Sequence, residues 1–343
     1  MSYQAYQLTS PNTLTLTTLS SIPKPGPNQA LIRIHAVALN PRDNAVISNS
    51  PSYPLRPKPN LVPCCDGAGV VETPGSSSIW RVGDRVILHG NTWMTGNDPR
   101  GFVLKDTLGS GENDGALQQH LVFDDARLVR APEYLSMEEA STFFAAGLTA
   151  YRALFHGPRP LEKGMTVLTQ GTGGVSCYAI QIASAAGATV IATSSSDGKL
   201  AVAKNLGATH LINYRTTPDW SSTVLELTAN NGVDIALDVV GASSIEQTLK
   251  AVGFGGAIIC LGMLGQNPFA PVNVMPAIMM GAKTVQGQLG AGSKALADEF
   301  AGFLERHPFR PQIARVFEWE TAAEGLEALK TLSEPGKIVV RVR

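Results

Sequence analysis

The residues with the clearest chemical pattern form a glycine-rich turn. Residues 166–176 read TVLTQGTGGVS, so an apolar, strand-like run leads directly into three glycines. Glycines let the backbone turn tightly and approach a pyrophosphate, and the helix that follows offers free N–H groups to the anion. Ser176 stands where the usual fingerprint has its third glycine, and a serine is small enough for that helix–strand contact. The alternative is a turn that binds no nucleotide. The predicted phosphate contacts are Gly171, Thr172, Gly173, Gly174 and Val175.

The end of the next strand-like run bears on the choice between NADH and NADPH. An acidic residue there holds the ribose 2′-hydroxyl of NAD, whereas hydroxyl and cationic groups favour a 2′-phosphate. The sequence is IATSSSDGK, so the run ends in hydroxyl side chains and Lys199 follows. We interpret Asp197 as a cap of the helix that carries Lys199. The pattern favours NADPH over NADH, with an ordinary solvated loop as the alternative. The candidate contacts are Ser194, Ser195, Ser196, Lys199, Tyr214 and Arg215.

Strand-like and helix-like segments alternate around this turn. The strand-like segments are 166–169, 189–193, 210–213, 235–239 and 257–261. The helix-like segments are 176–186, 199–206, 222–229 and 245–252. Such alternation predicts an α/β fold with a parallel, doubly wound sheet. Ligands bind outside the carboxyl ends of such strands, so Gly241, Gly262 and Met263, which follow the fourth and fifth strands, are further candidate cofactor contacts.

The segment before residue 126 has a different character. Residues 30–39 alternate as a half-buried strand should, and 67–72 and 81–88 look like further short strands. Ten of the 22 prolines fall within residues 1–63. Because proline removes a ladder donor, we expect loops and edge strands there. Residues 91–115 have no clear period and predict a long surface loop.

Helix-like periods return in two later regions. Residues 136–154 predict a helix, with Ser136 as its N-cap and Glu139 three residues on. Near the end of the chain, the pattern predicts helices at 295–305 and 321–332 and a closing strand at 337–342.

Seven segments together resemble landmarks of the medium-chain dehydrogenase/reductase superfamily, nearly end to end. They are ALNPRDN (38–44), VPCCDGAGVV (62–71), RVGDRV (81–86), LSMEEASTFFAAGLTAYRAL (135–154), the GTGGVS turn, LGATHLINYR (206–215) and PGKIVVRV (335–342). The resemblance implies a Rossmann doubly wound parallel sheet plus a GroES-like β domain. It assigns residues 1–125 and 292–343 to the GroES-like catalytic domain and 126–291 to the Rossmann NADPH-binding domain.

The resemblance also bears on zinc. Zinc enzymes of this superfamily hold the catalytic metal with a cysteine, a histidine and a third residue, usually cysteine. The positions that look equivalent carry Asn40, Cys65 and Ala146, and one thiolate cannot hold catalytic zinc. Residues 91–115 contain no cysteine, so the structural zinc lobe is missing too. We therefore expect no metal ligands and a place in the zinc-free branch that resembles quinone and enoyl reductases. We interpret the neighbouring Cys64 and Cys65 as buried and inert, with metal or redox work as the alternative.

Reduction of a C=C bond conjugated to a carbonyl suits a site without a Lewis acid. With hydride delivered from NADPH to the β-carbon, the charge that collects on the carbonyl oxygen needs only hydrogen-bond donors. By resemblance, Asn40 lies near the nicotinamide, and Tyr53 matches a pocket tyrosine that can donate to the oxyanion. A surface tyrosine is the alternative for Tyr53. Asp66 matches an acidic position of the family, where a structural hydrogen bond is at least as good an interpretation. Trp93 and Phe144 are interpreted as pocket or core residues.

Composition excludes some partners and leaves the function partly open. A net charge of −1 offers no attraction to nucleic acid, and no apolar run approaches the ~18 residues of a membrane span. Four cysteines without disulfide spacing and no secretion signal at the N-terminus predict a cytoplasmic protein with a small-molecule substrate. The resemblance implies a homodimer through an edge strand near 284–289. An NADP(H)-dependent carbonyl reductase or alcohol dehydrogenase, and a non-catalytic NADPH-binding protein, remain as alternatives.

Overall fold

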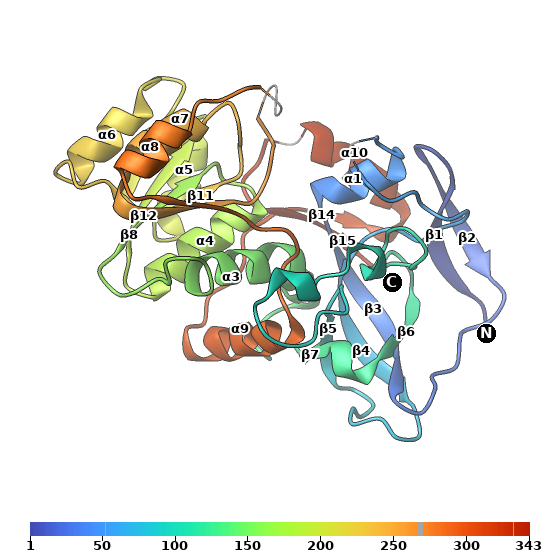
Figure 1. Ribbon diagram of the computed structural model, residues 1–343. Helices are drawn as coiled ribbons and strands as arrows, with labels where there is room; N and C mark the ends of the chain where they lie inside the picture. The colour runs from blue at the N-terminus through green and yellow to red at the C-terminus, as the bar shows by residue number, and fades with distance from the viewer. Residues whose placement is uncertain (52, 266–269, 332) are drawn as a thin grey trace. The chain divides into compact units, whose positions relative to one another are not determined.

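The chain divides into two compact units. The computed structural model describes residues 1–51, 53–265, 270–331 and 333–343 (Figure 1). Unit 1 comprises Met1–Leu148, Gly290–Ser333 and Lys337–Arg343, and unit 2 comprises Thr149–Leu289 and Glu334–Gly336. The division by contacts therefore falls at 148/149 and 289/290, whereas the sequence analysis divided the chain at 125/126 and 291/292. The segment 126–148 belongs with unit 1.

Unit 2 is built on a six-stranded parallel sheet in the order β10-β9-β8-β11-β12-β13. Its strands are β8 (Thr166–Gln170), β9 (Thr189–Ser194), β10 (His210–Asn213), β11 (Val233–Asp238), β12 (Val252–Cys260) and β13 (Thr284–Gly287). The order reverses between β8 and β11, which is the topological switch point where doubly wound sheets bind ligands. The predicted doubly wound sheet is confirmed.

Helices connect these strands and bury the apolar side chains of the sheet. They are α3 (Thr149–Phe155), α4 (Gly174–Ala185), α5 (Asp197–Asn205), α6 (Trp220–Leu227), α7 (Ile245–Ala251) and α8 (Met275–Met280). Leu168 and Ile258 of the sheet share one core cluster with Trp220 and Leu249 of the helices. The four helices predicted between strands are present, with ends that differ by a few residues. Helix α8 was not predicted from the sequence.

Unit 1 contains a seven-stranded sheet in the order β14-β15-β3-β4-β5-β7, with β6 pairing with β3. Its strands are β3 (Gln29–Leu39), β4 (Asp66–Pro74), β5 (Arg85–Leu88), β6 (His120–Asp124), β7 (Leu128–Arg130), β14 (Ile313–Glu318) and β15 (Lys337–Arg341). A separate hairpin consists of β1 (Tyr3–Ser10) and β2 (Thr13–Leu19). Figure 1 shows the return of the chain, with β15 in red beside β3 in blue.

The central strand β3 corrects one expectation. The alternation of residues 30–39 predicted a half-buried strand, but most of β3 is buried. The strand pairs with β4 on one side and with β6 and β15 on the other, and α2 (Met137–Ser141) and α10 (Ala322–Thr331) pack on it. These neighbours leave Arg33 as the one exposed residue of the strand.

The proline-rich segment corrects another expectation, because residues 41–47 form a helix rather than a loop or edge strand. This helix, α1 (Pro41–Ile47), begins at Pro41. The first helical position suits proline, since the N–H that proline lacks has no partner there and its φ is already helical. The carboxylate of Asp43 accepts the backbone N–H of Asn40 at 2.8 Å and so closes the first turn.

The remaining helices of unit 1 follow the predicted periods, with one interruption. Ser136 and Glu139 form the predicted reciprocal cap at the start of α2. The predicted helix 136–154 is not continuous, because a π-helix at Phe143–Leu148 separates α2 from α3. Near the C-terminus lie α9 (Lys294–Arg306) and α10, and residue 332 of the predicted helix 321–332 lies outside the described residues. None of the described helices is long and apolar enough to cross a membrane.

Candidate functional site

The glycine-rich turn of unit 2 has the geometry of a phosphate cradle. Gly171 follows β8 with a φ of +70°, a conformation that glycine adopts without strain. Gly173 is the N-cap of α4, which begins at Gly174. A Cβ added at Gly171 or Gly173 would meet no atom within 4 Å, so the backbone faces open space. The first N–H groups of α4 have no partner inside the helix. The turn therefore offers open space and free N–H donors, the two features that anion sites at helix N-termini share.

Side-chain hydroxyl groups stabilise the glycine-rich turn through hydrogen bonds. Ser176 is buried and donates from its Oγ to the carbonyl of Gln170 at 2.7 Å, so the serine fills the place of the third glycine without opening the helix–strand contact. The hydroxyls of Thr172 and Ser194 lie 3.2 Å apart, which ties the turn to the end of β9. Two of the predicted contacts, Thr172 and Ser194, are thus brought together.

The end of β9 gathers the residues predicted to select the cofactor. Lys199 Nζ donates to Ser195 Oγ at 3.1 Å, and Ser196 is the N-cap of α5. Tyr214 follows β10 and is 42% exposed. Asp197 is not the helix cap that we expected: it is the first residue of α5, and its carboxylate accepts from the side-chain amide of Asn213 at 2.9 Å. Ser196 has the geometry of the cap because its extended backbone directs the hydroxyl at the N–H of Lys199.

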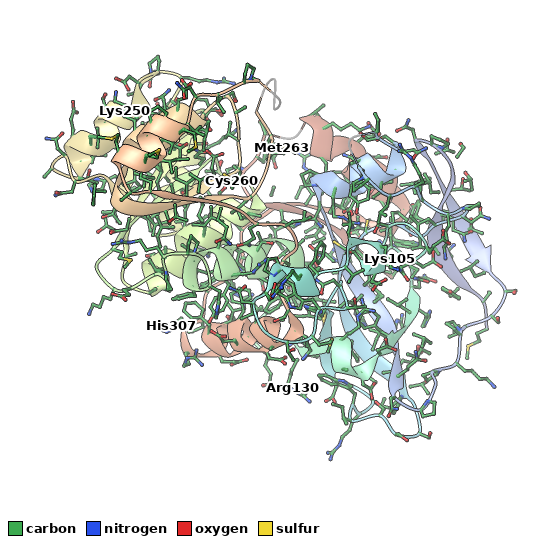
Figure 2. All side chains as sticks on the ribbon, in the orientation of Figure 1. Lys105, Arg130, Lys250, Cys260, Met263 and His307 are labelled. Carbon is green, nitrogen blue, oxygen red and sulfur yellow. The ribbon has the colours of Figure 1, made fainter. Side chains whose placement is uncertain are left out.

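The loops after β11 and β12 come together at the same edge of the sheet. Gly241 has a φ of +85°, and a Cβ placed on it would lie 3.4 Å from the carbonyl oxygen of Gly262 and 3.5 Å from Cα of Met263. Figure 2 shows Cys260, the last residue of β12, and Met263 in the loop that follows. The Met263 side chain is 62% exposed. The three residues predicted as cofactor contacts are therefore neighbours.

Asp238 supports these loops, and the sequence analysis did not single it out. It is buried at the end of β11, where Oδ1 accepts from the backbone N–H groups of Val240 and Gly241 at 2.9 and 2.7 Å. Its Oδ2 accepts from the hydroxyl of Thr248 at 2.9 Å. A carboxylate that ends an apolar strand was the available signal, because a buried carboxylate needs several donors.

A buried polar cluster lies at one end of the unit 1 sheet, around Asn40. The amide nitrogen of Asn40 donates to Oδ2 of Asp66 at 3.1 Å, and its amide oxygen accepts from Lys337 Nζ at 2.6 Å. Lys337 Nζ also donates to the carbonyl of Leu39 at 2.8 Å and lies 3.6 Å from Asp66. Asn40, Asp66 and Lys337 are all buried, so both ends of the amide are held by charged groups.

A chain of hydrogen bonds continues from Asn40 to Tyr53. The backbone N–H of Asn40 donates to Asp43, and Arg42 Nη1 lies 3.2 Å from the other oxygen of that carboxylate. Arg42 Nη1 also donates to the carbonyl of Leu108 at 3.2 Å, and Nη2 donates to Tyr53 Oη at 2.9 Å. The two predicted catalytic residues are therefore linked through two residues that lie between them. Together with Lys337 and Asp66, the cluster contains two cations and two carboxylates.

Burial governs the titration of this cluster. It raises the pKa of Asp66, while Lys337 and the hydrogen bond from Asn40 act in the opposite direction. Burial likewise raises the pKa of Asp43, against the attraction of Arg42. The Cys65 thiol is completely buried beside Asp66, and both effects raise its pKa. Cys65 is therefore a thiol, and its Sγ lies 3.7 Å from Asp66 Oδ1.

The donor set near Cys65 does not suit catalytic zinc. Asn40 Nδ2 lies 3.9 Å from Cys65 Sγ, and the N–H of Ala145, the neighbour of Ala146, donates to Asp66 at 3.0 Å. Zinc requires a thiolate and further nitrogen, sulfur or carboxylate donors around one point. Within residues 1–51, 53–265, 270–331 and 333–343, no three His, Cys, Asp or Glu side chains gather in a way that could hold a metal.

Sequence reasoning missed Lys337 and Arg42, which complete the cluster. A lysine in an otherwise apolar closing strand was the signal for Lys337, because a buried ammonium needs partners. Trp93 and Phe144, which were interpreted as pocket or core residues, are both buried in unit 1. The ring of Phe144 packs edge-on against that of His89, with centroids 5.0 Å apart.

Comparisons with known proteins agree with both units. The alcohol dehydrogenase GroES-like domain matches residues 26–133, and the zinc-binding dehydrogenase model matches residues 174–306. A zinc-type alcohol dehydrogenase-like protein of Schizosaccharomyces pombe is 33% identical over 323 residues, which cover 93% of this chain and 92% of that protein. The chain belongs to the medium-chain dehydrogenase/reductase superfamily.

Two further proteins that are similar to this chain have names other than zinc-type alcohol dehydrogenase-like protein. A quinone oxidoreductase of Mus musculus is 27% identical over 334 residues, which cover 94% of this chain and 92% of the relative. The crystal structure of a putative alcohol dehydrogenase from Sinorhizobium meliloti 1021 matches with a TM-score of 0.88 and 34% identity, over 99% of this chain and 98% of the other. The predicted resemblance is confirmed, and the chain is an oxidoreductase by family.

Proposed function

We propose that this protein is a zinc-independent, NADPH-dependent oxidoreductase that reduces a C=C bond conjugated to a carbonyl, in an enone, enoyl or quinone substrate. The observation that carries the proposal is the hydrogen-bonded chain from Asn40 through Asp43 and Arg42 to Tyr53. Asn40 stands at a position that looks equivalent to a metal ligand of the zinc enzymes, and the chain ends at the hydroxyl of Tyr53, which can donate a hydrogen bond. Donors of this kind stabilise a developing oxyanion without a metal.

NADPH is the proposed cofactor because the described residues of unit 2 fit it. The cradle at Gly171 and Gly173 is open to a pyrophosphate, and the paired Ser195 hydroxyl and Lys199 ammonium suit a 2′-phosphate. Asp197, the nearest carboxylate in sequence, is engaged by Asn213. When bound, the nicotinamide supplies a hydride to the β-carbon of the substrate.

The substitution Lys199→Ala tests the choice of cofactor. It should raise the Kd for NADPH by about 10-fold or more and leave the Kd for NADH nearly unchanged, because a charge-assisted hydrogen bond contributes about 1.5–3 kcal/mol. Lys204→Ala, at an exposed position of the same helix, is the matched control and should change neither constant. Fluorescence titration measures both. An equal loss for the two cofactors would contradict the assignment of Lys199 to the 2′-phosphate.

The residues of unit 1 then stabilise the substrate. Tyr53 donates a hydrogen bond to the carbonyl oxygen while negative charge collects there, and the α-carbon takes a proton from solvent. Asn40 stays fixed by Lys337 and Asp66 and shapes the polar wall of the site. The substrate gains one hydride and one proton, so its C=C bond becomes single and its carbonyl is restored.

A matched pair of substrates tests the proposed reaction. Protein treated with EDTA is mixed with NADPH and either an α,β-unsaturated ketone or its saturated analogue, and the absorbance of NADPH is followed. We expect consumption with the unsaturated ketone only. Consumption with the saturated ketone would indicate a carbonyl reductase, and tight NADPH binding without turnover across many acceptors would indicate a non-catalytic binder. Activity that EDTA abolishes and zinc restores would contradict zinc independence.

We further propose that two copies of the chain pair through β13. This strand pairs only with β12 among the described strands, so its outer edge carries unpaired backbone groups that need covering. The neighbouring helix α8 exposes Met275, Met279 and Met280, and Val285 of the strand is also exposed. Light scattering should give about twice the chain mass of 36.2 kDa. A single-chain mass would contradict the dimer.

We propose the cytoplasm as the place of action. The four cysteines are free thiols, and three of them, Cys64, Cys65 and Cys177, are buried. Free thiols are typical of proteins in a reducing compartment.

A further inference from the structure

We propose that Arg42 is a positioning residue that fixes Tyr53 as a one-directional hydrogen-bond donor to the substrate oxygen. The inference rests on the proposed function, because it takes Tyr53 as the group that meets the oxyanion. The superfamily resemblance assigns no role to Arg42, and the role proposed for it follows from the contacts of its guanidinium.

The contact between the two side chains is direct. Arg42 Nη2 donates to Tyr53 Oη at 2.9 Å, and the guanidinium carbon lies 5.6 Å from the centre of the tyrosine ring. The guanidinium therefore bonds the oxygen and also lies near the ring, which restricts where the phenol can point. The backbone of Tyr53 is held by its own N–H, which donates to the carbonyl of Ser50 at 3.0 Å.

The chemistry of the pair fixes the direction of the hydrogen bond. A guanidinium has donors only and stays protonated, so the oxygen of Tyr53 must accept from Arg42. The phenolic hydrogen is then left over. Within the part of the chain that the structure describes, Tyr53 Oη has no acceptor for that hydrogen. It is available to a substrate, and the positive charge beside the oxygen strengthens it as a donor when negative charge develops on the substrate.

The surroundings of Arg42 hold the guanidinium in place. Nη1 lies 3.2 Å from Asp43 and 3.2 Å from the carbonyl of Leu108, so three segments of unit 1 meet at one planar group. The Asp43 side chain is completely buried and balances the charge of Arg42, while Arg42 keeps 21% of its side chain exposed. The planar guanidinium of Arg42 holds its donors in a fixed geometry toward several partners. A lysine ammonium on a flexible stem cannot reproduce this geometry.

A bound chromophore tests the inference without turnover. The probe is 4-dimethylaminocinnamaldehyde, an enal whose absorption shifts to the red when its oxygen accepts a strong hydrogen bond, bound together with NADP⁺ so that no hydride is available. We expect the red shift to be largest in the unchanged protein, small in Arg42→Gln, intermediate in Arg42→Lys and absent in Tyr53→Phe. Arg56→Gln is the matched control, since it removes an arginine from the same segment that contacts Asn49 and Ser50 instead, and it should keep the full shift.

Kinetics of the same variants supply a second readout. Tyr53→Phe should lower kcat by about 10²-fold, the range seen when an oxyanion donor is removed, and Arg42→Gln by about 10-fold, with smaller changes in KM. Because Arg42 acts through Tyr53, the double variant should match Tyr53→Phe within about 2-fold. Arg42→Lys keeps the charge beside buried Asp43, so it decides the question if Arg42→Gln fails to fold.

The outcomes separate this inference from the proposed function. A full red shift in both Arg42 variants together with its loss in Tyr53→Phe would overturn the role of Arg42 and leave Tyr53 as the donor. Multiplied losses in the double variant would also overturn it. If the protein reduces no enone but the red shift still depends on both side chains, the proposed reaction fails and the positioning role stands.

Discussion

The candidate sites of the two units consist of different chemical groups. In unit 2, the cradle is made of backbone: Gly171 and Gly173 face open space, and the N–H groups at the start of α4 are the donors. In unit 1, the site is made of buried charged side chains, with Asn40 held between Asp66 and Lys337. A backbone site needs the right conformation, whereas a buried ionic site needs every partner, because one missing partner leaves a charge uncompensated.

This difference predicts how each unit fails. Changes in the unit 2 turn should alter ligand affinity more than folding, since the turn lies at the surface and only its shape matters. Changes in the unit 1 cluster should affect folding first, because an unpaired buried charge lowers the free energy of unfolding of unit 1.

The largest effect is expected for Lys337→Met. The change leaves the oxygen of Asn40, the carbonyl of Leu39 and the carboxylate of Asp66 without their cation, and losing one partner of a buried pair costs about 3–5 kcal/mol. Urea denaturation should show this loss in the free energy of unfolding. Lys330→Met is the control, because its pair with Glu327 is exposed and contributes less than about 1 kcal/mol. Equal stability of the two variants would contradict the dependence of folding in unit 1 on the buried cluster.

A smaller effect is expected from His89, another buried polar side chain of unit 1. Its ring nitrogens lie 3.0 and 3.1 Å from the carbonyls of Asn91 and Gly292, and burial lowers its pKa to about 4. The folded pKa is below the unfolded value, so the contribution to stability is present above about pH 6.5 and is lost as the pH falls towards 4. Between about pH 8 and pH 5 the loss should be about 2 kcal/mol.

Unfolding experiments at the two pH values check this prediction. His89→Gln removes the titrating group, so its stability should fall less between them than that of the unchanged protein. His307→Gln, near the end of α9 in the same unit, is the control and should retain the full acid-dependent loss. If His89→Gln retained the same loss, then other groups would cause the acid sensitivity.

The smallest effect on folding is expected in the turn of unit 2, where Gly171 can be compared with Gly164, which lies before β8. Gly171→Ala and Gly164→Ala each place a side chain at positive φ with no atom within 4 Å, so each should cost about 1–2 kcal/mol of stability. Only Gly171→Ala should raise the Kd for NADPH, by about 10-fold or more, because its Cβ projects into the cradle. Calorimetry measures both quantities. Equal Kd values for the two variants would contradict the position of the phosphate site.

The sequence predicted unit 2 better than unit 1 for a physical reason. Buried parallel strands and amphipathic helices impose local periods, and the glycine turn joins β8 to α4 within a few residues. The fold of unit 2 and the neighbouring positions of Gly241 and Met263 could therefore be inferred from local patterns. Even there, Asp197 was misassigned, since a neighbouring serine had the better backbone geometry for the cap.

Unit 1 depends on contacts between distant parts of the chain, which no local pattern contains. Asn40 and Lys337 are 297 residues apart, and their bond exists only because β15 returns to pair with β3. Likewise, Arg42 was passed over because its partners, Tyr53 and the carbonyl of Leu108, lie outside its own helix. Asn40 and Tyr53 were identified through the family resemblance. The resemblance did not show that Asp43 and Arg42 connect them.

The most direct test of the proposed reaction follows the hydride itself. NADPH that carries deuterium at the transferred position is incubated with the protein, EDTA and an α,β-unsaturated ketone, and the product is examined by NMR spectroscopy. The account predicts a saturated ketone with deuterium on the β-carbon. Deuterium on the carbinol carbon of an unsaturated alcohol would contradict it and would make the protein a carbonyl reductase.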